Sequence, residues 1–313
     1  MKKVLVVHYS QTGQLADIVG TLLQPLRAAG VAIHEEVLRP AQPHPFPWPF
    51  FEFLDVFPES VRLDAAPNLP LTVPADADFD LVILAWQVWY LSPSLPVTAF
   101  LKSAEGRRLL AGKPVVSVVA CRNMWMTAHE KLAALLADAG ARLVDHVALT
   151  DGAHPLATFI TTPRWMFTGR RDRFLGLPRA GVAGEDVAGA ARFGSALAAA
   201  LAADRERSGE PMLAGLRAAV VNPRLVISER AGQRAFKVWS ALVRACGRPG
   251  QRRRRPALAL FALYLVTLII TVVPASLALQ TLFAPLLRAR LERLRAQYEQ
   301  PSGSADFRLT RNG

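Results

Sequence analysis

The sequence predicts an α/β fold with a doubly wound, five-stranded parallel sheet, followed by a C-terminal transmembrane helix. Three observations support this prediction. Over the first 150 residues, short apolar runs alternate with segments of helical period, which is the pattern of βαβ units. Glycines stand where two of the helical segments end, at Gly30 and Gly140. Further on, residues 257–287 form a long apolar run without a charged side chain.

The expected strands are short and rich in valine and leucine, as buried parallel strands are. They are residues 3–8, 31–37, 81–86, 115–121 and 143–149. The segments between them repeat apolar residues every three to four positions, which gives each helix a face that can pack on the sheet. The expected helices are residues 15–29, 94–110, 127–139 and 185–203.

Two long segments interrupt this alternation, and we expect them to be functional or to have structure of their own, because long structureless loops are uncommon in compact domains. Residues 40–75 are rich in proline and aromatic side chains and replace the expected second helix at least in part, whereas residues 151–184 combine aromatic side chains with arginines. We therefore expect a domain over residues 1–205 with insertions at 40–75 and 151–184, a basic connector at 206–256, a membrane segment at 257–287 and a basic tail at 288–313.

The positive charge is distributed unevenly along the chain. The formal net charge is +12; residues 151–256 carry 19 basic and 8 acidic side chains, whereas residues 1–150 carry 12 and 14. A basic stretch suits nucleic acid or an anionic membrane surface. Because this one leads directly into the apolar run and contains no nucleic-acid-binding motif, a membrane is favoured and nucleic acid is not expected as a partner.

The first strand ends in a loop that suits a phosphate monoester. Residues 9–14 read Tyr-Ser-Gln-Thr-Gly-Gln, and a helix follows at once. Hydroxyl groups, the conformational freedom of glycine and the N–H groups of a helix start can together surround an anion. No lysine is present, so the loop is not of the Walker type. The expected phosphate-binding residues are Ser10, Gln11, Thr12, Gly13 and Gln14.

This segment resembles the phosphate loop of the flavodoxin family, in which a hydroxyl residue, any residue, Thr, Gly, a polar residue and usually a second Thr follow one another. The resemblance implies bound FMN. Leu15 stands at the last of these positions, so one hydroxyl ligand is missing, which can weaken the affinity. A tight strand-to-helix turn without a ligand is the alternative interpretation.

Two further strand ends are expected to contact the flavin, because ligands in such folds lie at the carboxyl ends of the strands. The segment after the third strand resembles the loop that flanks the flavin ring in flavodoxins and flavodoxin-like quinone reductases, and Trp89 or Tyr90 can stack on the ring. After the fourth strand, backbone N–H groups and the Asn123 amide can bind its polar edge. The expected contacts are Gln87, Val88, Trp89, Tyr90, Cys121, Arg122, Asn123, Met124 and Trp125.

Two residues are candidates for catalysis. Arg122 would favour the anionic reduced flavin and raise its reduction potential, which points to chemistry on a bound substrate; pairing with a carboxylate is its alternative role. His154 could exchange a proton near the flavin, although a loop histidine without a special role is the alternative. Cys121 lacks a supporting base and is expected to be a small buried residue. No metal site is expected, since His129-Glu130 lacks a second histidine.

The apolar run is long enough to cross a bilayer, which takes about 20 residues. Arginines flank it on both sides, and the larger cluster precedes it, which places the flavin domain on the cytoplasmic side of the inner membrane. A single pass sends the tail outwards, whereas Pro274 and Pro285 leave room for a re-entrant or interfacial arrangement with both ends inside. A buried helix of a soluble protein is a further alternative.

The whole chain also resembles the bacterial flavodoxin-like proteins known as dialkylresorcinol condensing enzymes. The resemblance lies in residues 9–14, 45–60, 86–102, 121–125 and 158–167. It implies a role in making lipidic resorcinols or related aryl pigments. Condensation of acyl chains normally needs an activated cysteine with histidine partners, and the sequence offers none, whereas a flavin can dehydrogenate a cyclic diketone to an aromatic resorcinol.

We therefore expect a membrane-anchored FMN-dependent oxidoreductase that acts on a small lipophilic cyclic substrate, with NAD(P)H or a quinone as redox partner. The insertion at 40–75 and residues 158–167 would form an apolar entrance beside the flavin. The alternatives are a quinone reductase, a membrane-tethered FMN module that transfers electrons without chemistry of its own, and a scaffold that has lost the flavin. The expected partners are the lipid bilayer and the substrate, and a homodimer stays open.

Overall fold

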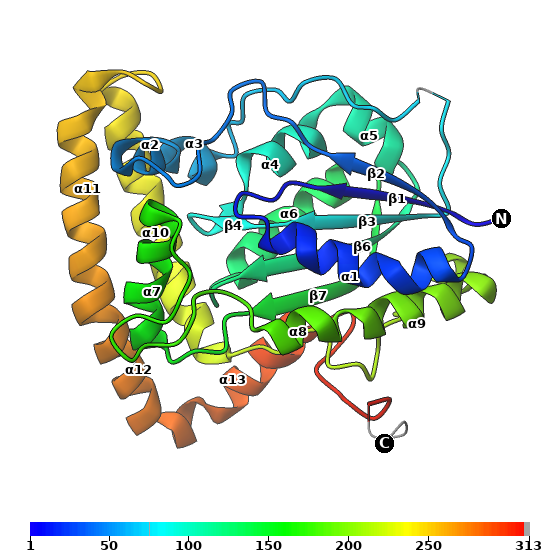
Figure 1. The fold of residues 1–313 in the computed structure, drawn as a ribbon. Coiled ribbons are helices and arrows are strands. Elements are labelled where there is room, and N and C mark those ends of the chain that lie inside the picture. The colour runs from blue at the N-terminus through cyan, green and yellow to red at the C-terminus, as the bar shows by residue number, and fades with distance from the viewer. Residues whose placement is uncertain (75, 310–313) are drawn as a thin grey trace.

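Figure 1 shows the fold in a computed structural model, which describes residues 1–74 and 76–309. Its centre is a five-stranded parallel sheet in the order β2-β1-β3-β6-β7. The predicted fold class is confirmed, because this order is 2-1-3-4-5 among the parallel strands, the flavodoxin-like arrangement. Each predicted strand agrees with the structure to within one residue at its ends. The strands are β1 (Lys3–His8), β2 (Ala32–Val37), β3 (Leu81–Trp86), β6 (Pro114–Cys121) and β7 (Arg142–Thr150).

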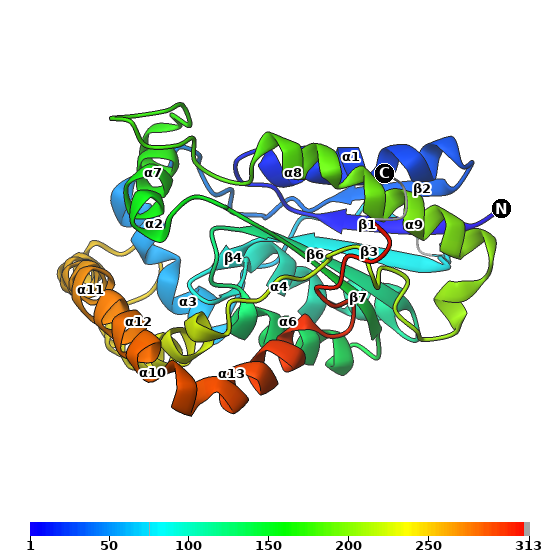
Figure 2. The ribbon, with the colours of Figure 1, turned by 90° about the horizontal axis from the view of Figure 1, so that it is seen from below.

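Helices cover both faces of the sheet, as Figure 2 shows. One face carries α1 (Gln14–Ala28), α8 (Gly184–Gly189) and α9 (Ala191–Ala202). The other carries α4 (Leu95–Lys102), α5 (Ala104–Leu110) and α6 (Met126–Asp138). The two helices expected at residues 94–110 and 185–203 are thus each divided in two in the structure.

The central strand β3 supplies both cores of this three-layer domain. All of its residues are buried, as expected for a parallel strand with helices on both sides. Because successive side chains of a strand point to opposite faces, Leu81, Ile83 and Ala85 join the core under α1 and α9. Val82, Leu84 and Trp86 join the core under α4 and α6.

The two insertions contain helices that stand beyond the carboxyl ends of the strands. The first insertion folds into α2 (Phe50–Asp55) and α3 (Phe57–Arg62), and the second contains α7 (Pro155–Thr168). In Figure 1 the strand arrows point toward α2, α7 and the helices that follow in the chain. The insertions therefore cover the carboxyl edge of the sheet, which is where doubly wound folds bind ligands.

Residues 206–250, expected to be a connector, pack closely on the domain. The carboxylate of Asp145 in β7 accepts hydrogen bonds from Met212 N at 2.8 Å and from Leu213 N at 3.1 Å. The chain then forms α10 (Pro223–Ala245), whose Phe236 and Val243 belong to a third core together with α2 and α3. This segment is therefore structural as well as connecting.

The apolar run forms one long interrupted helix. It consists of α11 (Arg255–Thr267), a π-helical turn η3 (Leu268–Val272) and α12 (Val273–Leu282). Over the 31 residues from Arg252 to Leu282, this helix is long and apolar enough to cross a membrane. After it, α13 (Ala284–Glu299) returns toward α10 and the sheet.

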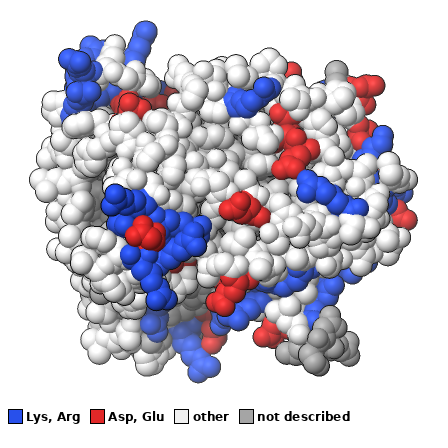
Figure 3. Space-filling view, in the orientation of Figure 1, with Lys and Arg blue, Asp and Glu red and all other residues white. Residues whose placement is uncertain are grey.

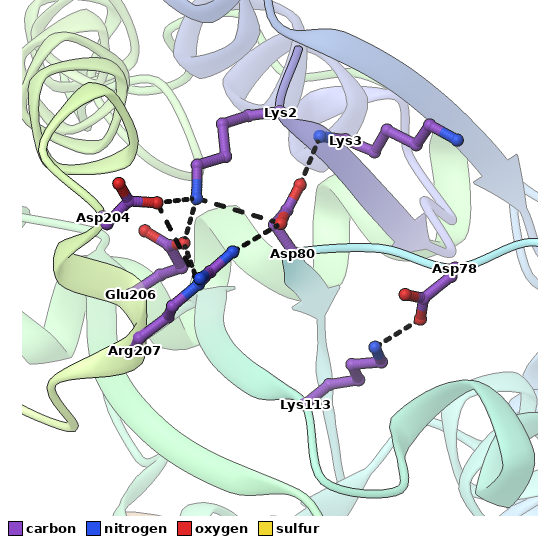
Figure 4. Close-up of polar contacts among 8 residues, drawn as sticks. All are labelled: Lys2, Lys3, Asp78, Asp80, Lys113, Asp204, Glu206 and Arg207. Atoms are coloured by element: carbon purple, nitrogen blue, oxygen red, sulfur yellow. Dashed lines mark hydrogen bonds and ion pairs between the residues drawn. The ribbon is translucent and has the colours of Figure 1, made fainter.

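Ion pairs and hydrogen bonds connect the segments at the opposite, amino edge of the sheet (Figure 4). Lys2 Nζ donates to Asp204 Oδ1 at 2.6 Å and also contacts Glu206, and both carboxylates follow α9. The backbone N–H of Lys3 donates to Asp80 Oδ2 at 2.8 Å. These bonds join the last helix of the domain to the starts of β1 and β3, away from the candidate site.

Candidate functional site

A cavity of about 370 Å³ lies at the carboxyl edge of the sheet. It begins at the loop between β1 and α1, passes the ends of β3 and β6, and reaches α10, α11 and η3. Segments far apart in the sequence thus share one site, in the place where the strand order of a doubly wound sheet reverses.

The loop between β1 and α1 has the geometry of an anion site. Gly13 has a φ of +85° and begins α1, and its carbonyl accepts a hydrogen bond from Asp17 N at 3.0 Å. Ser10 Oγ accepts one from Ala16 N at 3.2 Å. Thr12 lines the cavity at the start of the helix. Because the first N–H groups of a helix have no intrahelical partner, they can hold a phosphate at this position.

The second insertion closes over this loop through Gln14. Its side chain exchanges two hydrogen bonds with the backbone of Val182, of 3.0 and 3.1 Å. The neighbouring Gly181 has a φ of +88°, and a Cβ there would lie 2.7 Å from Gln14 Oε1 and 2.8 Å from a ring carbon of Trp165. Glycine is therefore required where the two segments meet.

The first insertion is tied to the same loop through Gln11. The amide nitrogen of Gln11 donates to the carbonyls of His44, at 3.0 Å, and Pro45, at 2.8 Å. Its backbone N–H donates to Gln87 Oε1 at 3.3 Å. The Gln11 side chain therefore positions the insertion. Its amide nitrogen and its backbone N–H are both engaged within the protein, and the residue contributes to the site as part of the cavity lining.

The end of β3 carries a short hairpin with an aromatic wall. β4 (Val88–Trp89) and β5 (Ser92–Pro93) are joined by Tyr90 and Leu91, which have φ angles of +49° and +57°. Two-residue hairpin turns of type I′ have positive φ at both turn positions, and for residues other than glycine this is strained backbone of the kind found at functional sites. Tyr90 is held by a 2.7 Å hydrogen bond from its hydroxyl to the carbonyl of Phe53.

Trp89 stands at the centre of this wall. Its ring meets three others nearly at right angles, with centroid distances of 4.9 Å to His44, 5.5 Å to Trp48 and 6.0 Å to Tyr9. Aromatic pairs favour such edge-to-face packing. The prediction that Trp89 or Tyr90 stacks on a flavin stays a prediction.

Arg122 is a half-buried cation directly after β6. Its guanidinium lies 4.0 Å from the centroid of the Phe159 ring, and burial lowers its pKa to about 10, against the opposing effect of the nearby Asp151 carboxylate. Asp151 lines the same cavity and accepts hydrogen bonds from Ala153 N at 2.9 Å and Gly181 N at 2.8 Å. Arg122 retains its positive charge at neutral pH and faces a site that suits an anionic ligand.

Three buried polar atoms of the cavity lining have no hydrogen-bond partner among the described residues. They are Arg122 Nε, Trp48 Nε1 and Ser228 Oγ. Buried polar atoms are nearly always paired, so an orphaned group in a cavity indicates a ligand. Two of the three are N–H donors, which match the carbonyl oxygens and ring nitrogens of a flavin, and the loop at β1 matches its phosphate. These residues fit FMN.

The far end of the cavity is apolar. α10 contributes Leu225, Gly232 and Phe236, spaced as one helical face. From α11 and η3 come Leu265, Leu268 and Ile269. The cavity therefore has a polar end at the sheet and an apolar end at the long C-terminal helix.

The structure brings most of the predicted site residues together. The cavity is lined by Gln11, Thr12, Gln14, Gln87, Val88, Trp89, Tyr90, Cys121, Arg122, Asn123 and Met124. Ser10 and Gly13 shape the loop, and Trp125 is buried in the core beneath it. His154 is exposed before α7 and is not part of the lining. Burial raises the pKa of the Cys121 thiol above its usual range, in keeping with its expected inert character.

The cavity is also lined by residues that the sequence did not single out, namely Trp48, Asp151, Gly181 and the α10 face. The first three lie in the two insertions, which were expected to be functional or to have structure of their own, and Asp151 directly follows β7 at the carboxyl edge of the sheet. The α10 face lies in the connector, for which no site was predicted. Among the described residues, no group of three or more His, Cys, Asp or Glu side chains is arranged to hold a metal ion.

No protein-family model matches the sequence, and no curated protein matches it either. Among solved structures, flavoproteins and flavodoxins are similar to parts of the chain at low identity and low TM-score. A flavoprotein from Lactobacillus acidophilus NCFM, in complex with FMN, is 13% identical with a TM-score of 0.39, over 47% of this chain and 93% of its own. A flavodoxin from the domain Archaea is 11% identical with a TM-score of 0.35, over 64% and 99% of the two chains. Flavodoxin 1 from Bacillus cereus is 13% identical with a TM-score of 0.31, over 62% and 95%. The fold class rests on the strand order itself.

Proposed function

We propose that this protein is a membrane-attached, FMN-dependent oxidoreductase that acts on a lipophilic cyclic substrate. One observation carries the proposal: a single cavity connects an anion-binding loop at β1 with the inner side of the apolar helix formed by α11 and η3. A ligand with a phosphate and a ligand with an apolar body can therefore meet in one place.

In this proposal FMN supplies the two-electron oxidation and reduction. Ser10, Thr12, Gly13 and the start of α1 hold its phosphate. Arg122 and Trp48 turn their partnerless N–H groups toward the ring, which a flavin's acceptor atoms satisfy. Leu15 is fully buried in the core and offers the phosphate no side-chain donor, so the loop would bind it through Ser10, Thr12 and backbone N–H groups.

The lipophilic class of the substrate follows from the apolar end of the cavity. Leu225, Phe236 and Leu268 exclude water and offer no charged partner, so an apolar ring with alkyl substituents is favoured there. Dehydrogenation of a cyclic diketone to a resorcinol fits this site. The ring would lose a hydride and a proton; bound FMN would supply the two-electron oxidation, the proton would pass to solvent, and a quinone, becoming a quinol, would accept the two electrons and two protons in the end. We therefore propose a role in the biosynthesis of dialkylresorcinols or related aryl lipids, which is what the resemblance of the sequence implies.

A second function is favoured by the same apolar end. A quinone with an apolar tail also fits between α10 and α11, so the protein could act as a quinone reductase or as an FMN electron-transfer module. Arg122 favours an enzyme over a simple carrier, because a half-buried cation at the flavin stabilises its anionic reduced form.

Attachment to the cytoplasmic side of the inner membrane completes the proposal. The apolar helix is the attachment element, and the arginines before it supply the positive charge that the cytoplasmic side favours. Because the substrate is lipophilic, a membrane location brings enzyme and substrate together.

The cofactor is tested first. The protein is purified in detergent, its visible spectrum is recorded, and the FMN-free form is titrated with FMN. We expect flavin absorption and saturable binding, and a colourless protein that does not bind added FMN contradicts the proposal.

The substrate is tested next. The loaded protein is mixed without oxygen with cyclic diketones of increasing apolar size. Flavin bleaching by the diketones supports the dehydrogenase; bleaching by none of them, with oxidation of the reduced flavin by quinones, favours the alternative.

A further inference from the structure

The apolar helix is fixed to the domain at its beginning. Arg254, one residue before α11, is fully buried, and its guanidinium contacts Asp55 Oδ1 at 3.1 Å and Glu59 Oε2 at 3.0 Å. A buried cation with two carboxylate partners is expensive to separate from them. The start of the helix is therefore held against α2 and α3.

The chain that follows the helix is fixed to the same domain. Ser302 Oγ donates to Asp145 Oδ1 at 2.7 Å and accepts from His146 N at 2.7 Å, and all of these groups are buried. The carbonyl of Ala305 accepts from Arg217 N at 2.7 Å, and Arg308 N donates to the carbonyl of Gly215 at 3.0 Å. The tail thus lies on the sheet domain, as does the start of the helix.

One side of the helix is packed and the other is bare. On the packed side, the Phe261 ring stacks on that of Phe57 with a centroid distance of 3.7 Å. On the opposite side, Leu263 is 64% exposed and Ile270 67% exposed. A bare apolar stripe of this length is uncommon on a protein that is surrounded by water only.

Exposed arginines stand before and after the apolar helix along the chain. Arg252, Arg253 and Arg255 are exposed before it, and Arg290 and Arg293 are exposed on α13 after it. In Figure 3 the left edge of the molecule, where α11 lies in Figure 1, is white between the blue groups at the upper left and those at the bottom, whereas a separate blue cluster lies nearer the centre. Arginines beside an apolar stripe match the phosphates and acyl chains of an anionic leaflet.

We infer that this helix does not cross the bilayer but lies along one leaflet, with Leu263 and Ile270 among the acyl chains and the arginines at the headgroups. The protein is then monotopic, and its sheet domain and its C-terminal tail lie on the same side of the membrane. A crossing helix would carry the tail to the other side and would separate Ser302 from Asp145. This inference rests on the membrane attachment proposed above and specifies its form.

Topology is the first test. The chain is expressed in bacteria with one epitope tag at each end, and protease is added to inside-out and right-side-out membrane vesicles. We expect both tags to be cleaved in inside-out vesicles and both to be protected in right-side-out ones until detergent is added. A C-terminal tag that is cleaved in right-side-out vesicles, with an N-terminal tag that is not, overturns the inference and leaves membrane attachment intact. A wild-type protein that is absent from the membrane fraction refutes the attachment itself.

The lipid-facing stripe is the second test. In the variant Leu263→Glu/Ile270→Glu, we expect the membrane-bound fraction to fall at least tenfold, with FMN absorption and the unfolding midpoint retained. The matched control is Val37→Glu/Leu69→Glu, which changes two exposed apolar residues elsewhere and should leave the bound fraction unchanged. If the stripe variant stays on the membrane, or only converts a dimer into a monomer there, the stripe is an interface between copies and the inference is wrong.

The exposed arginines before and after the helix are the third test. Purified protein should bind vesicles that contain phosphatidylglycerol more tightly than vesicles of phosphatidylcholine alone, and added salt should reduce the difference. Arg290→Gln/Arg293→Gln should reduce the preference, whereas equal binding to both kinds of vesicle would count against headgroup contacts by these arginines.

Discussion

Glu229 on α10 accepts hydrogen bonds from Thr127 N, at 2.7 Å, and from the Thr127 hydroxyl, at 2.8 Å, at the start of α6. The carboxyl group is fully buried. It joins the helix that lines the apolar end of the cavity to the segment that carries Arg122 and Asn123. The Glu229 side chain therefore connects the element at the apolar end of the site to the segment at its polar end.

Glu229 should make the protein less stable as the pH rises. Burial raises its pKa from 4.5 to about 7, so its folded-state contribution is fully present below pH 4.5 and is lost as the pH rises through 7. The loss can reach about 3 kcal/mol. Glu229→Gln retains an acceptor for Thr127 and should flatten this dependence in urea unfolding at pH 5 and pH 8. The exposed Glu105→Gln is the control, and an equal change in both variants would assign the effect to another group.

The histidine pair below the cavity should act in the opposite direction. The rings of His129 and His146 lie 3.9 Å apart between centroids, and burial lowers the pKa of His129 from 6.5 to about 4. Between pH 6.5 and pH 4, His129 is protonated in the unfolded chain but stays neutral in the folded core. The free energy of unfolding should therefore fall as the pH drops from 6.5 to 4, by as much as about 3 kcal/mol for this residue. His129→Leu should reduce this loss in unfolding at pH 4.5, whereas the exposed His154→Leu should not.

Gly181 should be essential for the closure of the phosphate loop. In Gly181→Ala, the new Cβ meets Gln14 and Trp165 at a φ of +88°, so the Gln14–Val182 bonds must shift. We expect FMN affinity to fall about tenfold, which corresponds to about 1.4 kcal/mol. Gly184→Ala is the matched control, because a Cβ there meets nothing within 4 Å. Fluorescence titration of the FMN-free proteins measures the FMN affinity of both variants. Equal affinities would show that the contact between Gln14 and Val182 does not contribute to FMN binding.

Arg122 should set the reduction potential of the bound flavin. Removal of its charge in Arg122→Leu destabilises the anionic reduced form, so the potential should fall. A loss of about 1.4 kcal/mol corresponds to about 30 mV for a two-electron couple. Arg122→Lys should recover part of the change. Spectroelectrochemistry on the loaded proteins measures the potentials, and an unchanged potential in the leucine variant would show that Arg122 pairs with Asp151 alone.

Local patterns in the sequence were sufficient for the sheet and for the polar end of the site. β1 and β3 read as buried strands because parallel strands are continuous apolar runs, and the loop at Ser10 is defined by its own few residues. The contribution of α10 could not be predicted in this way. Its cavity face depends on how a helix after residue 222 packs on α6 and α11, and such long-range packing leaves no local signature in a basic, polar sequence.

The apolar run shows a second limit of local information. Length and hydropathy are the same for a crossing helix and for one that packs along a domain. The distinction depends on Arg254 finding Asp55 and Glu59, and on Ser302 finding Asp145, which are contacts across more than half of the chain. Likewise, the proline and aromatic content of residues 40–75 did not indicate the two short helices that this segment forms.

Gly232 should control access to the apolar end of the cavity. It lies on the cavity face of α10, and a Cβ there would meet only Leu91 Cδ1 at 3.3 Å, the movable end of a flexible side chain. A leucine in its place fits the helix and improves its propensity, but it fills the space between α10 and α11. We therefore expect Gly232→Leu to fold and bind FMN normally, while turnover of lipophilic cyclic substrates falls at least tenfold and turnover of small water-soluble quinones is retained. Ala231→Leu, on the neighbouring exposed position, is the matched control and should leave both activities unchanged. Equal loss of both activities in the Gly232 variant would mean that the apolar end belongs to the flavin site itself and not to a separate part for the substrate.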